Sequence, residues 1–118
     1  MRYMLLIYTD PAVDAAQPPE AGEAMMGEYQ AFTEKIVASG EMISGEPLQG
    51  TEAATSVRVR DGRTSTTDGP FAETKEVLGG YYLVDVADLD RATELAAQIP
   101  GARTGTVEVR PIWEFPAQ

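Results

Sequence analysis

The sequence contains no cysteine and no histidine among its 118 residues. Without thiols, the chain forms no disulfide, has no cysteine nucleophile and holds no cysteine–zinc site. Without imidazole, it has no serine–histidine triad and no histidine base that titrates near neutral pH. The groups left for acid–base chemistry are carboxylates, lysine and tyrosine, and we expect neither a bound metal nor a cofactor.

Basic residues are also scarce. Nine lysines and arginines stand against nineteen acidic residues, for a formal net charge of −10. This charge repels nucleic-acid phosphates and anionic lipid surfaces unless a basic patch overrides it. The nearest approach to a patch is Arg58, Arg60 and Arg63, but Asp61 interrupts it, and a solvated strand face accounts for it. We therefore predict neither a nucleic-acid partner nor a membrane partner.

Long hydrophobic runs are missing as well. The apolar residues at the amino terminus reach Asp10 and Pro11 too soon for a secretory segment or for a membrane span of about 20 residues. We expect a cytoplasmic protein. The length is close to that of one typical domain, so residues 1–118 are predicted to form a single domain.

The hydrophobic pattern predicts seven elements. Residues 3–8 are apolar at every position, as in a strand buried on both faces. Asp61-Gly62 favours a two-residue hairpin turn, Gly40 a helix end, and Asp88 a helix start. In chain order the predicted elements are a strand at 3–8, a helix at 21–39, a weak strand at 42–48, a hairpin at 56–60 and 63–67, a strand at 81–86, a helix at 89–99 and a strand at 106–110. The connection at 9–20 is predicted to be irregular.

This order predicts an α+β fold: a ferredoxin-like antiparallel sheet with two helices on one face and an extra hairpin. Two helices cover only one face of such a sheet, yet the strands at 3–8 and 81–86 are apolar on both faces. A second copy of the chain, packed sheet against sheet, is the economical cover. The sequence therefore predicts a homodimer.

The segment with the most candidate functional residues lies between the hairpin and the strand at 81–86. Gly69 before Pro70 indicates an extended bend. Phe71 is predicted to anchor this loop in the core, and the anchored loop then presents the charges around Lys75. Gly79-Gly80 lacks the lysine and spacing of a phosphate-binding loop, so a turn or a close backbone approach accounts for it. Two interpretations stay open: a rigid binding or catalytic loop, and an ordered crossover between strands.

This segment, together with residues 3–8, 57–62 and 108–112, resembles the YCII-related family in its DGPF subgroup, named for the four residues found here as Asp68-Gly69-Pro70-Phe71. The resemblance implies the dimeric α+β barrel fold. YCII-like proteins include a dehydrochlorinase that acts on a chlorinated aromatic, with a suggested site of one histidine and one aspartate. Only the aspartate has a counterpart here, at Asp68. Genes of the subgroup often lie beside those for extracytoplasmic-function sigma factors, which implies a signalling role or a conditionally expressed activity.

Two functional hypotheses follow. The first is a small-molecule site, between the sheets of the dimer or beside the Asp68 loop, that works by cofactor-independent proton transfer of the lyase or isomerase type. Asp68 is its base or hydrogen-bond acceptor, and Lys75 and Arg110 bind anionic groups. Glu108 and Arg110 share the polar face of a strand whose other face is core, and a carboxylate beside an arginine is a pairing that binding sites use. The alternative for this pair is a structural ion pair.

Three tyrosines, Tyr3, Tyr81 and Tyr82, are placed to line such a cavity, with core packing as the alternative. The second hypothesis is a non-catalytic regulatory or interaction protein of an extracytoplasmic-function sigma factor pathway. The two hypotheses differ in whether Asp68, Glu108 and Arg110 converge on one pocket.

Overall fold

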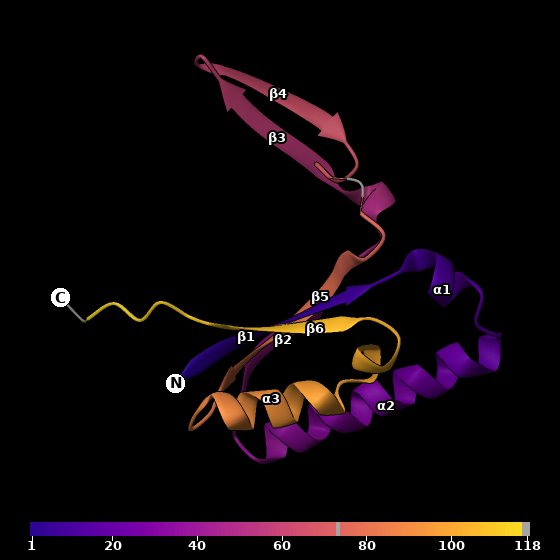
Figure 1. The fold of residues 1–118 in the computed structure, drawn as a ribbon, viewed down its shortest axis with the longest axis vertical. Coiled ribbons are helices and arrows are strands. Elements are labelled where there is room, and N and C mark those ends of the chain that lie inside the picture. The colour runs from indigo at the N-terminus through magenta and orange to yellow at the C-terminus, as the bar shows by residue number, and fades with distance from the viewer. Residues whose placement is uncertain (73, 117–118) are drawn as a thin grey trace.

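The computed structural model describes residues 1–72 and 74–116 (Figure 1). In chain order its elements are β1 (Arg2–Thr9), α1 (Pro11–Ala15), α2 (Pro19–Ala38), β2 (Met42–Pro47), a short 3-10 turn (Thr51–Ala53), β3 (Thr55–Arg60), β4 (Arg63–Asp68), β5 (Val77–Asp85), α3 (Leu89–Gln98), a second 3-10 turn (Pro100–Arg103) and β6 (Thr106–Pro111). The predicted order of the strands and of helices α2 and α3 is confirmed.

Four strands form one antiparallel sheet in the order β2-β5-β1-β6. The first strand of the chain thus lies inside the sheet, between the last strand and the one before α3, which is consistent with the predicted ferredoxin-like fold. The connection at 9–20 was predicted to be irregular, and this prediction is wrong. Asp10 caps α1 by accepting a hydrogen bond from the Ala12 amide at 2.9 Å, and Pro11 fits the first helical position.

The core lies between this sheet and helices α2 and α3, which cover the same face (Figure 1). Leu5 of β1, Ile36 of α2 and Leu95 of α3 are among its fully buried side chains. Along β1, burial alternates: Tyr3, Leu5 and Ile7 are buried, whereas the residues between them are half-buried. The half-buried set belongs to the opposite face of the sheet, which no helix of the described residues covers.

That opposite face, here called the open face, has an apolar centre. Strand alternation and cross-strand register place Met4, Leu6 and Tyr8 of β1 on it, beside Tyr81 and Leu83 of β5. All five are half-buried in the single chain. The predicted second apolar face therefore exists, and the single chain leaves it partly exposed to water.

One ion pair links α3 to the chain between α2 and β2. Arg91 of α3 donates two hydrogen bonds to Glu41, from Nε at 2.8 Å and from Nη2 at 2.9 Å. This paired contact, with help from the Ser39 hydroxyl, lowers the pKa of Glu41 to about 2. The α3 start is capped as predicted, because the Asp88 carboxylate accepts from the Arg91 amide at 2.9 Å. Gly40 takes a φ of 79° just past the end of α2, also as predicted.

Strands β3 and β4 form a separate two-stranded hairpin, here called the arm (residues 55–68), that stands away from the sheet (Figure 1). Its tip is the predicted two-residue turn, with φ of 52° at Asp61 and 74° at Gly62. Val57 and Val59 on the arm are 60% and 57% exposed. The Cα radius of gyration is 16.5 Å, against about 13.5 Å for a compact chain of this length. The arm is thus an extension without a core of its own.

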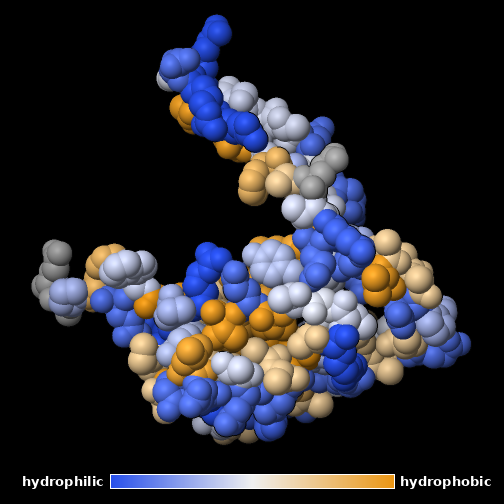
Figure 2. Space-filling view, in the orientation of Figure 1, coloured by the Kyte–Doolittle hydropathy of each residue, from blue (hydrophilic) through white to orange (hydrophobic). Residues whose placement is uncertain are grey.

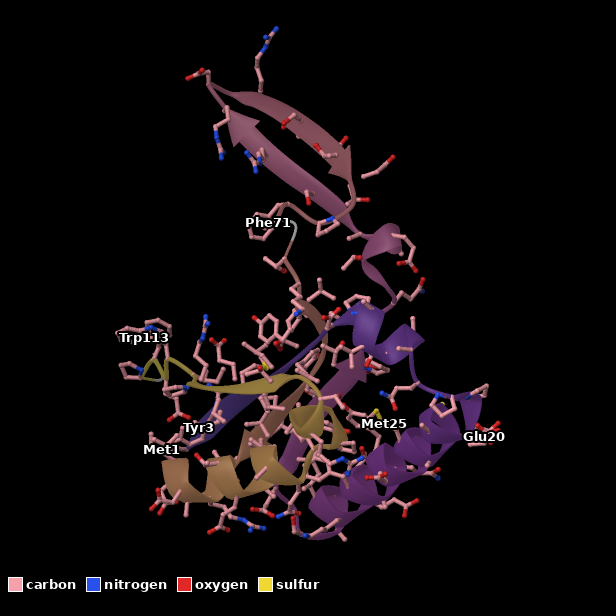
Figure 3. All side chains as sticks on the ribbon, turned by 45° about the vertical axis from the view of Figure 1, so that its right-hand side comes forward. Met1, Tyr3, Glu20, Met25, Phe71 and Trp113 are labelled. Carbon is pink, nitrogen blue, oxygen red and sulfur yellow. The ribbon has the colours of Figure 1, made fainter. Side chains whose placement is uncertain are left out.

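Phe71 does not anchor in the core, so that prediction is wrong. Its side chain is 79% exposed and lies at the base of the arm (Figure 3). The physical reason is that the segment around Phe71 leads back from the arm rather than across the sheet. The described chain pairs with the sheet again at Val77, where β5 begins beside Thr9.

Candidate functional site

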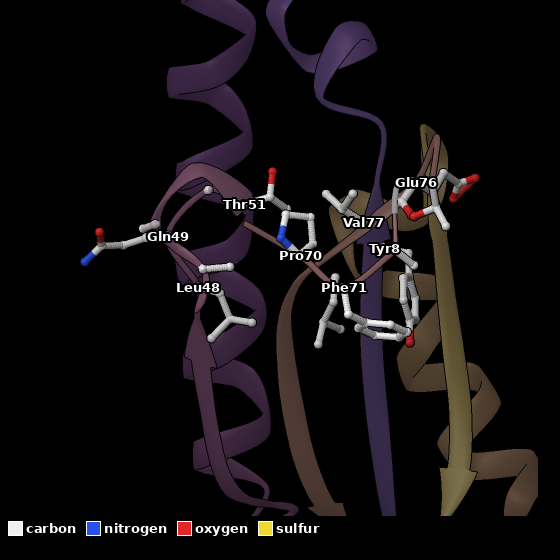
Figure 4. A pocket seen from close by; sticks show the side chains of 14 residues that line it. Tyr8, Leu48, Gln49, Thr51, Pro70, Phe71, Glu76 and Val77 are labelled. Atoms are coloured by element: carbon white, nitrogen blue, oxygen red, sulfur yellow. The ribbon is translucent and has the colours of Figure 1, made fainter. Parts of the chain in front are cut away.

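A cleft of about 650 Å³ lies where the arm joins the sheet (Figure 4). This volume is within the range of small-molecule pockets. Its walls come from two chain segments, one within residues 48–54 and one that begins at Pro70 and ends at Leu78, and from Tyr8 of β1. The lining residues are Tyr8, Leu48, Gln49, Gly50, Thr51, Ala53, Ala54, Pro70, Phe71, Ala72, Thr74, Glu76, Val77 and Leu78.

Backbone hydrogen bonds hold the two segments in place. Leu48 donates its amide to the Gly79 carbonyl at 2.9 Å, and the Gly69 amide donates to the Ala54 carbonyl at 2.7 Å. The Ser56 hydroxyl donates to the Gly69 carbonyl at 2.8 Å. Gly69 has a φ of 96°, a left-handed conformation that glycine adopts without steric cost. Gly69 and Pro70 thus form the predicted bend, and the bend sets one wall of the cleft.

Gly80 provides the close backbone approach that the Gly79-Gly80 pair predicts. A Cβ atom built on Gly80 would lie 3.0 Å from the carbonyl oxygen of Glu46 in the neighbouring strand β2. Glycine therefore lets β2 and β5 approach at the point where Leu48 leaves the sheet for the cleft wall.

Among the described residues, Glu76 is the acidic residue that lines the cleft. Its Oε1 atom is buried and has no hydrogen-bond partner among the described residues. The same cleft is lined by Pro70, Phe71 and Val77. A buried carboxylate oxygen without a partner is costly for the fold, which is typical of an atom that accepts a hydrogen bond from a ligand.

The structure does not bring the predicted site residues to this cleft. Asp68 is exposed at the end of β4, opposite Thr55, and is not part of the lining. Lys75 is also exposed and outside the lining. In the described part of the chain, no hydrogen bond or ion pair joins Asp68 to Lys75, Glu108 or Arg110.

Glu108 and Arg110 do lie together, but on the open face of the sheet. Their side chains form an ion pair at 2.6 Å between Glu108 Oε1 and Arg110 Nη2. Both side chains are substantially exposed, so the pair matches the structural alternative at least as well as a binding role.

The three tyrosines divide between the two faces. Tyr82 is buried under the helices, with its hydroxyl 2.7 Å from the Thr33 hydroxyl and its ring edge-on to Phe32 at 5.2 Å. Tyr3 is also buried on the helix side. Tyr81 alone of the three lies on the open face.

Sequence reasoning named neither Glu76 nor Tyr8 as a site residue. Glu76 stands one residue before β5, where a charge directly adjoins a strand with a buried face. Tyr8 lies opposite Leu78 across a register shift between Ile7 and Tyr8. The position of Glu76 directly before a strand can be read from the sequence. The irregular strand pairing that places Tyr8 at the cleft cannot.

No group of three or more acidic side chains in residues 1–72 and 74–116 is arranged to hold a metal ion. Nor is any helix in this part of the chain both long enough and apolar enough to cross a membrane.

The fold and the cleft define a ferredoxin-like α+β protein with a hairpin arm. A family model for the YCII-related domain matches residues 1–116. A protein of Rhizobium meliloti (strain 1021), described only as uncharacterised, is 41% identical over 114 residues, which cover 95% of this chain and 92% of that protein. The chain belongs to the YCII-related family.

Proposed function

We propose that the protein is a homodimer that binds a small molecule in the cleft at the base of the arm. The observation that supports ligand binding best is the buried Oε1 atom of Glu76, which has no partner among the described residues. The matching ligand has a compact apolar or aromatic body and one hydroxyl or other donor that meets this oxygen.

The dimer is supported by the surface that one chain leaves exposed. The chain exposes 8322 Å², whereas a compact monomer of 12.7 kDa exposes about 6,200 Å². The excess is more than twice the roughly 800 Å² that one partner buries in a standard interface. The apolar centre of the open face is the natural surface for a second sheet.

The chemistry proposed for the cleft is proton transfer by Glu76. A carboxylate takes a proton from a C–H or O–H group of the ligand. It returns the proton to another atom of the same molecule in an isomerase reaction. In a lyase reaction a leaving group departs with its electron pair as the double bond forms. Glu76 replaces Asp68 as the first candidate base, because Glu76 lines the cleft and Asp68 does not.

Binding is tested by NMR titration of the full chain with phenol, using toluene as a probe of equal shape without a donor. We expect saturable amide shifts at Val77 and Leu78 with phenol and a weaker response to toluene. Glu76→Gln is expected to weaken phenol binding about tenfold, because a neutral acceptor forms a weaker hydrogen bond than a carboxylate. Glu23→Gln, on the exposed side of α2, is the matched control and should leave the dissociation constant unchanged.

Phenol shifts scattered over the surface, or an equal dissociation constant for Glu76→Gln and the unsubstituted protein, would refute this site. Asp68→Asn belongs in the same titration. An unchanged dissociation constant is expected for it, and a weaker one would restore Asp68 to the site.

The second candidate is a non-catalytic regulatory protein that contacts an extracytoplasmic-function sigma factor. The exposed arm favours it, because Val57 and Val59 are available to a protein partner. The test is co-sedimentation of the purified protein with such sigma factors from its own organism. A complex that is lost in Val57→Ser/Val59→Ser, while phenol binding persists, supports this role. No complex at physiological salt refutes it.

A further inference from the structure

The carboxyl-terminal segment carries a second exposed apolar surface. In this segment, here called the tail (residues 112–116), Trp113 is 84% and Phe115 is 81% exposed. Their rings stack on each other with centroids 6.2 Å apart and planes 14° apart. A stacked aromatic pair in water leaves much of the large apolar area of its rings uncovered, which is the composition typical of an interface anchor.

The tail is held in extension beyond the sheet rather than folded onto its own body. The Ile112 amide donates to the Arg2 carbonyl at 3.0 Å, which prolongs the pairing of β6 with β1. Arg2 also donates from its backbone amide and from Nε to Glu114, each at 3.3 Å. Figure 1 shows the tail as an extended segment that leaves the sheet. Its aromatic rings are therefore presented outward in a defined place.

The arm and the tail leave the sheet at opposite ends of β1. The tail starts beside Tyr3, which pairs with Pro111. The arm returns to the sheet beside Thr9, which pairs with Val77. The seven residues from Tyr3 to Thr9 span about 20 Å in an extended strand. Figure 3 shows the same separation, with Trp113 at one end of the sheet and Phe71 at the base of the arm.

We consider two sheets that face each other across a two-fold axis perpendicular to their strands. This axis places the tail end of β1 in one chain opposite the arm end of β1 in the other. Under that symmetry the tail of one chain comes to the arm of the other, and the same contact is repeated on the far side. The space-filling view shows apolar atoms over the sheet and on the side of the arm that faces it (Figure 2). The arm and the open face thus border the same concave side of the molecule.

From this geometry we propose that the tail of each subunit packs on the arm of the other, with Trp113 and Phe115 covering the partner's Phe71 and closing the partner's cleft. This inference rests on the homodimer proposed above and adds that each ligand site is completed by the other chain. Phe71 lines both the cleft and a hollow of about 540 Å³ on the arm, together with Val57 and Arg58. A ring seated there shields the cleft from water.

Charge supports the second copy as the occupant. The arm carries three arginines and two aspartates, while the rest of the chain carries six basic and seventeen acidic residues. A weakly positive arm is therefore attracted to the strongly negative body of another copy. Arg58 beside the hollow also suits an aromatic ring, because a guanidinium is attracted to the face of an indole.

Engineered cysteines give a direct test, because the chain contains no cysteine of its own. We expect that an arm variant, Val59→Cys, mixed and refolded with a tail variant, Trp113→Cys, yields a disulfide-linked dimer under mild oxidation. The matched control replaces the tail variant by Thr93→Cys, which is exposed on α3, and should yield far less linked dimer.

Trp113 provides a second measurement, because it is the sole tryptophan. In the unsubstituted dimer its fluorescence should be protected from acrylamide, and the protection should disappear in Leu83→Glu, which is designed to separate the subunits. A sedimentation mass recorded for the same samples distinguishes loss of the dimer from loss of the tail contact alone.

A dimeric mass without arm-to-tail linkage, and with Trp113 fully open to acrylamide, overturns the tail contact but leaves the homodimer and the phenol site standing. Linkage within one chain in the doubly substituted protein overturns it as well. Linkage between chains together with no phenol binding refutes the proposed ligand function and supports the tail contact.

Discussion

Leu83→Glu is expected to separate the dimer while leaving the fold of each chain intact. Leu83 lies on the open face, opposite Met4 in β1 and Ser44 in β2. It is half-buried in the single chain, so a glutamate there still reaches water when the chain is alone. In the proposed dimer, the same position lies in an apolar seam and occurs twice.

The magnitude follows from burial. Covering an exposed leucine is worth about 1.5–3 kcal/mol, and roughly half of this remains for a side chain that is already half-buried. Because the position occurs twice in the dimer, the two copies together lose about 2 kcal/mol of association free energy. Two carboxylates brought into the seam add several kcal/mol of desolvation. A total of at least about 5 kcal/mol corresponds to a dissociation constant weakened by more than about a thousandfold.

Sedimentation velocity at micromolar concentration is the assay, with far-ultraviolet circular dichroism to confirm that the chain is folded. Leu89→Glu is the matched control, since Leu89 is exposed on α3 away from the sheet. We expect a folded monomer for Leu83→Glu and a dimer for Leu89→Glu. A Leu83→Glu protein that stays dimeric with an unchanged dissociation constant refutes the open face as the interface.

Three predictions concern the fold that supports the site. Glu41→Gln should lower the free energy of unfolding by about 1–2 kcal/mol at pH 7, after allowing for the partial exposure of Arg91. Because the pKa of Glu41 is lowered to about 2, the difference should be complete above about pH 4.5 and vanish as the pH falls through 2 in urea titrations. An equal difference at pH 2 and pH 7 would contradict it. Asp88→Ala should cost about 1 kcal/mol in the same titrations by removing the α3 cap, whereas no loss would show the cap to be dispensable. Gly105→Ala should lower the melting temperature by several degrees, because the added Cβ meets the Tyr8 carbonyl oxygen, and an unchanged value would contradict this contact.

The fold was largely predictable because its signals are local. Asp88 and Gly40 mark helix ends, and Asp61-Gly62 marks the hairpin tip, each through the backbone conformation that its residue type favours. The exception, α1, is capped by Asp10, a signal that was present but was read as part of an irregular connection.

The candidate site was less predictable, because it depends on where the chain goes after the hairpin. Hydrophobicity alone placed Phe71 in the core, but the arm stands off the sheet and takes Phe71 with it. Tyr82 was grouped with cavity residues, although alternation along β5 puts it under the helices. The position of Glu76 beside β5 can be read from the sequence, but its place in the cleft depends on the three-dimensional approach of two loop segments, which no spacing in the sequence encodes.

In the proposed dimer, a second copy of the chain covers the open face and the arm. The most direct measurement is the mass of the unsubstituted protein by sedimentation equilibrium over a range of micromolar concentrations. We expect a particle of twice the 12.7 kDa chain mass, with no concentration-dependent loss down to about 1 μM. A single species of 12.7 kDa throughout that range would contradict it.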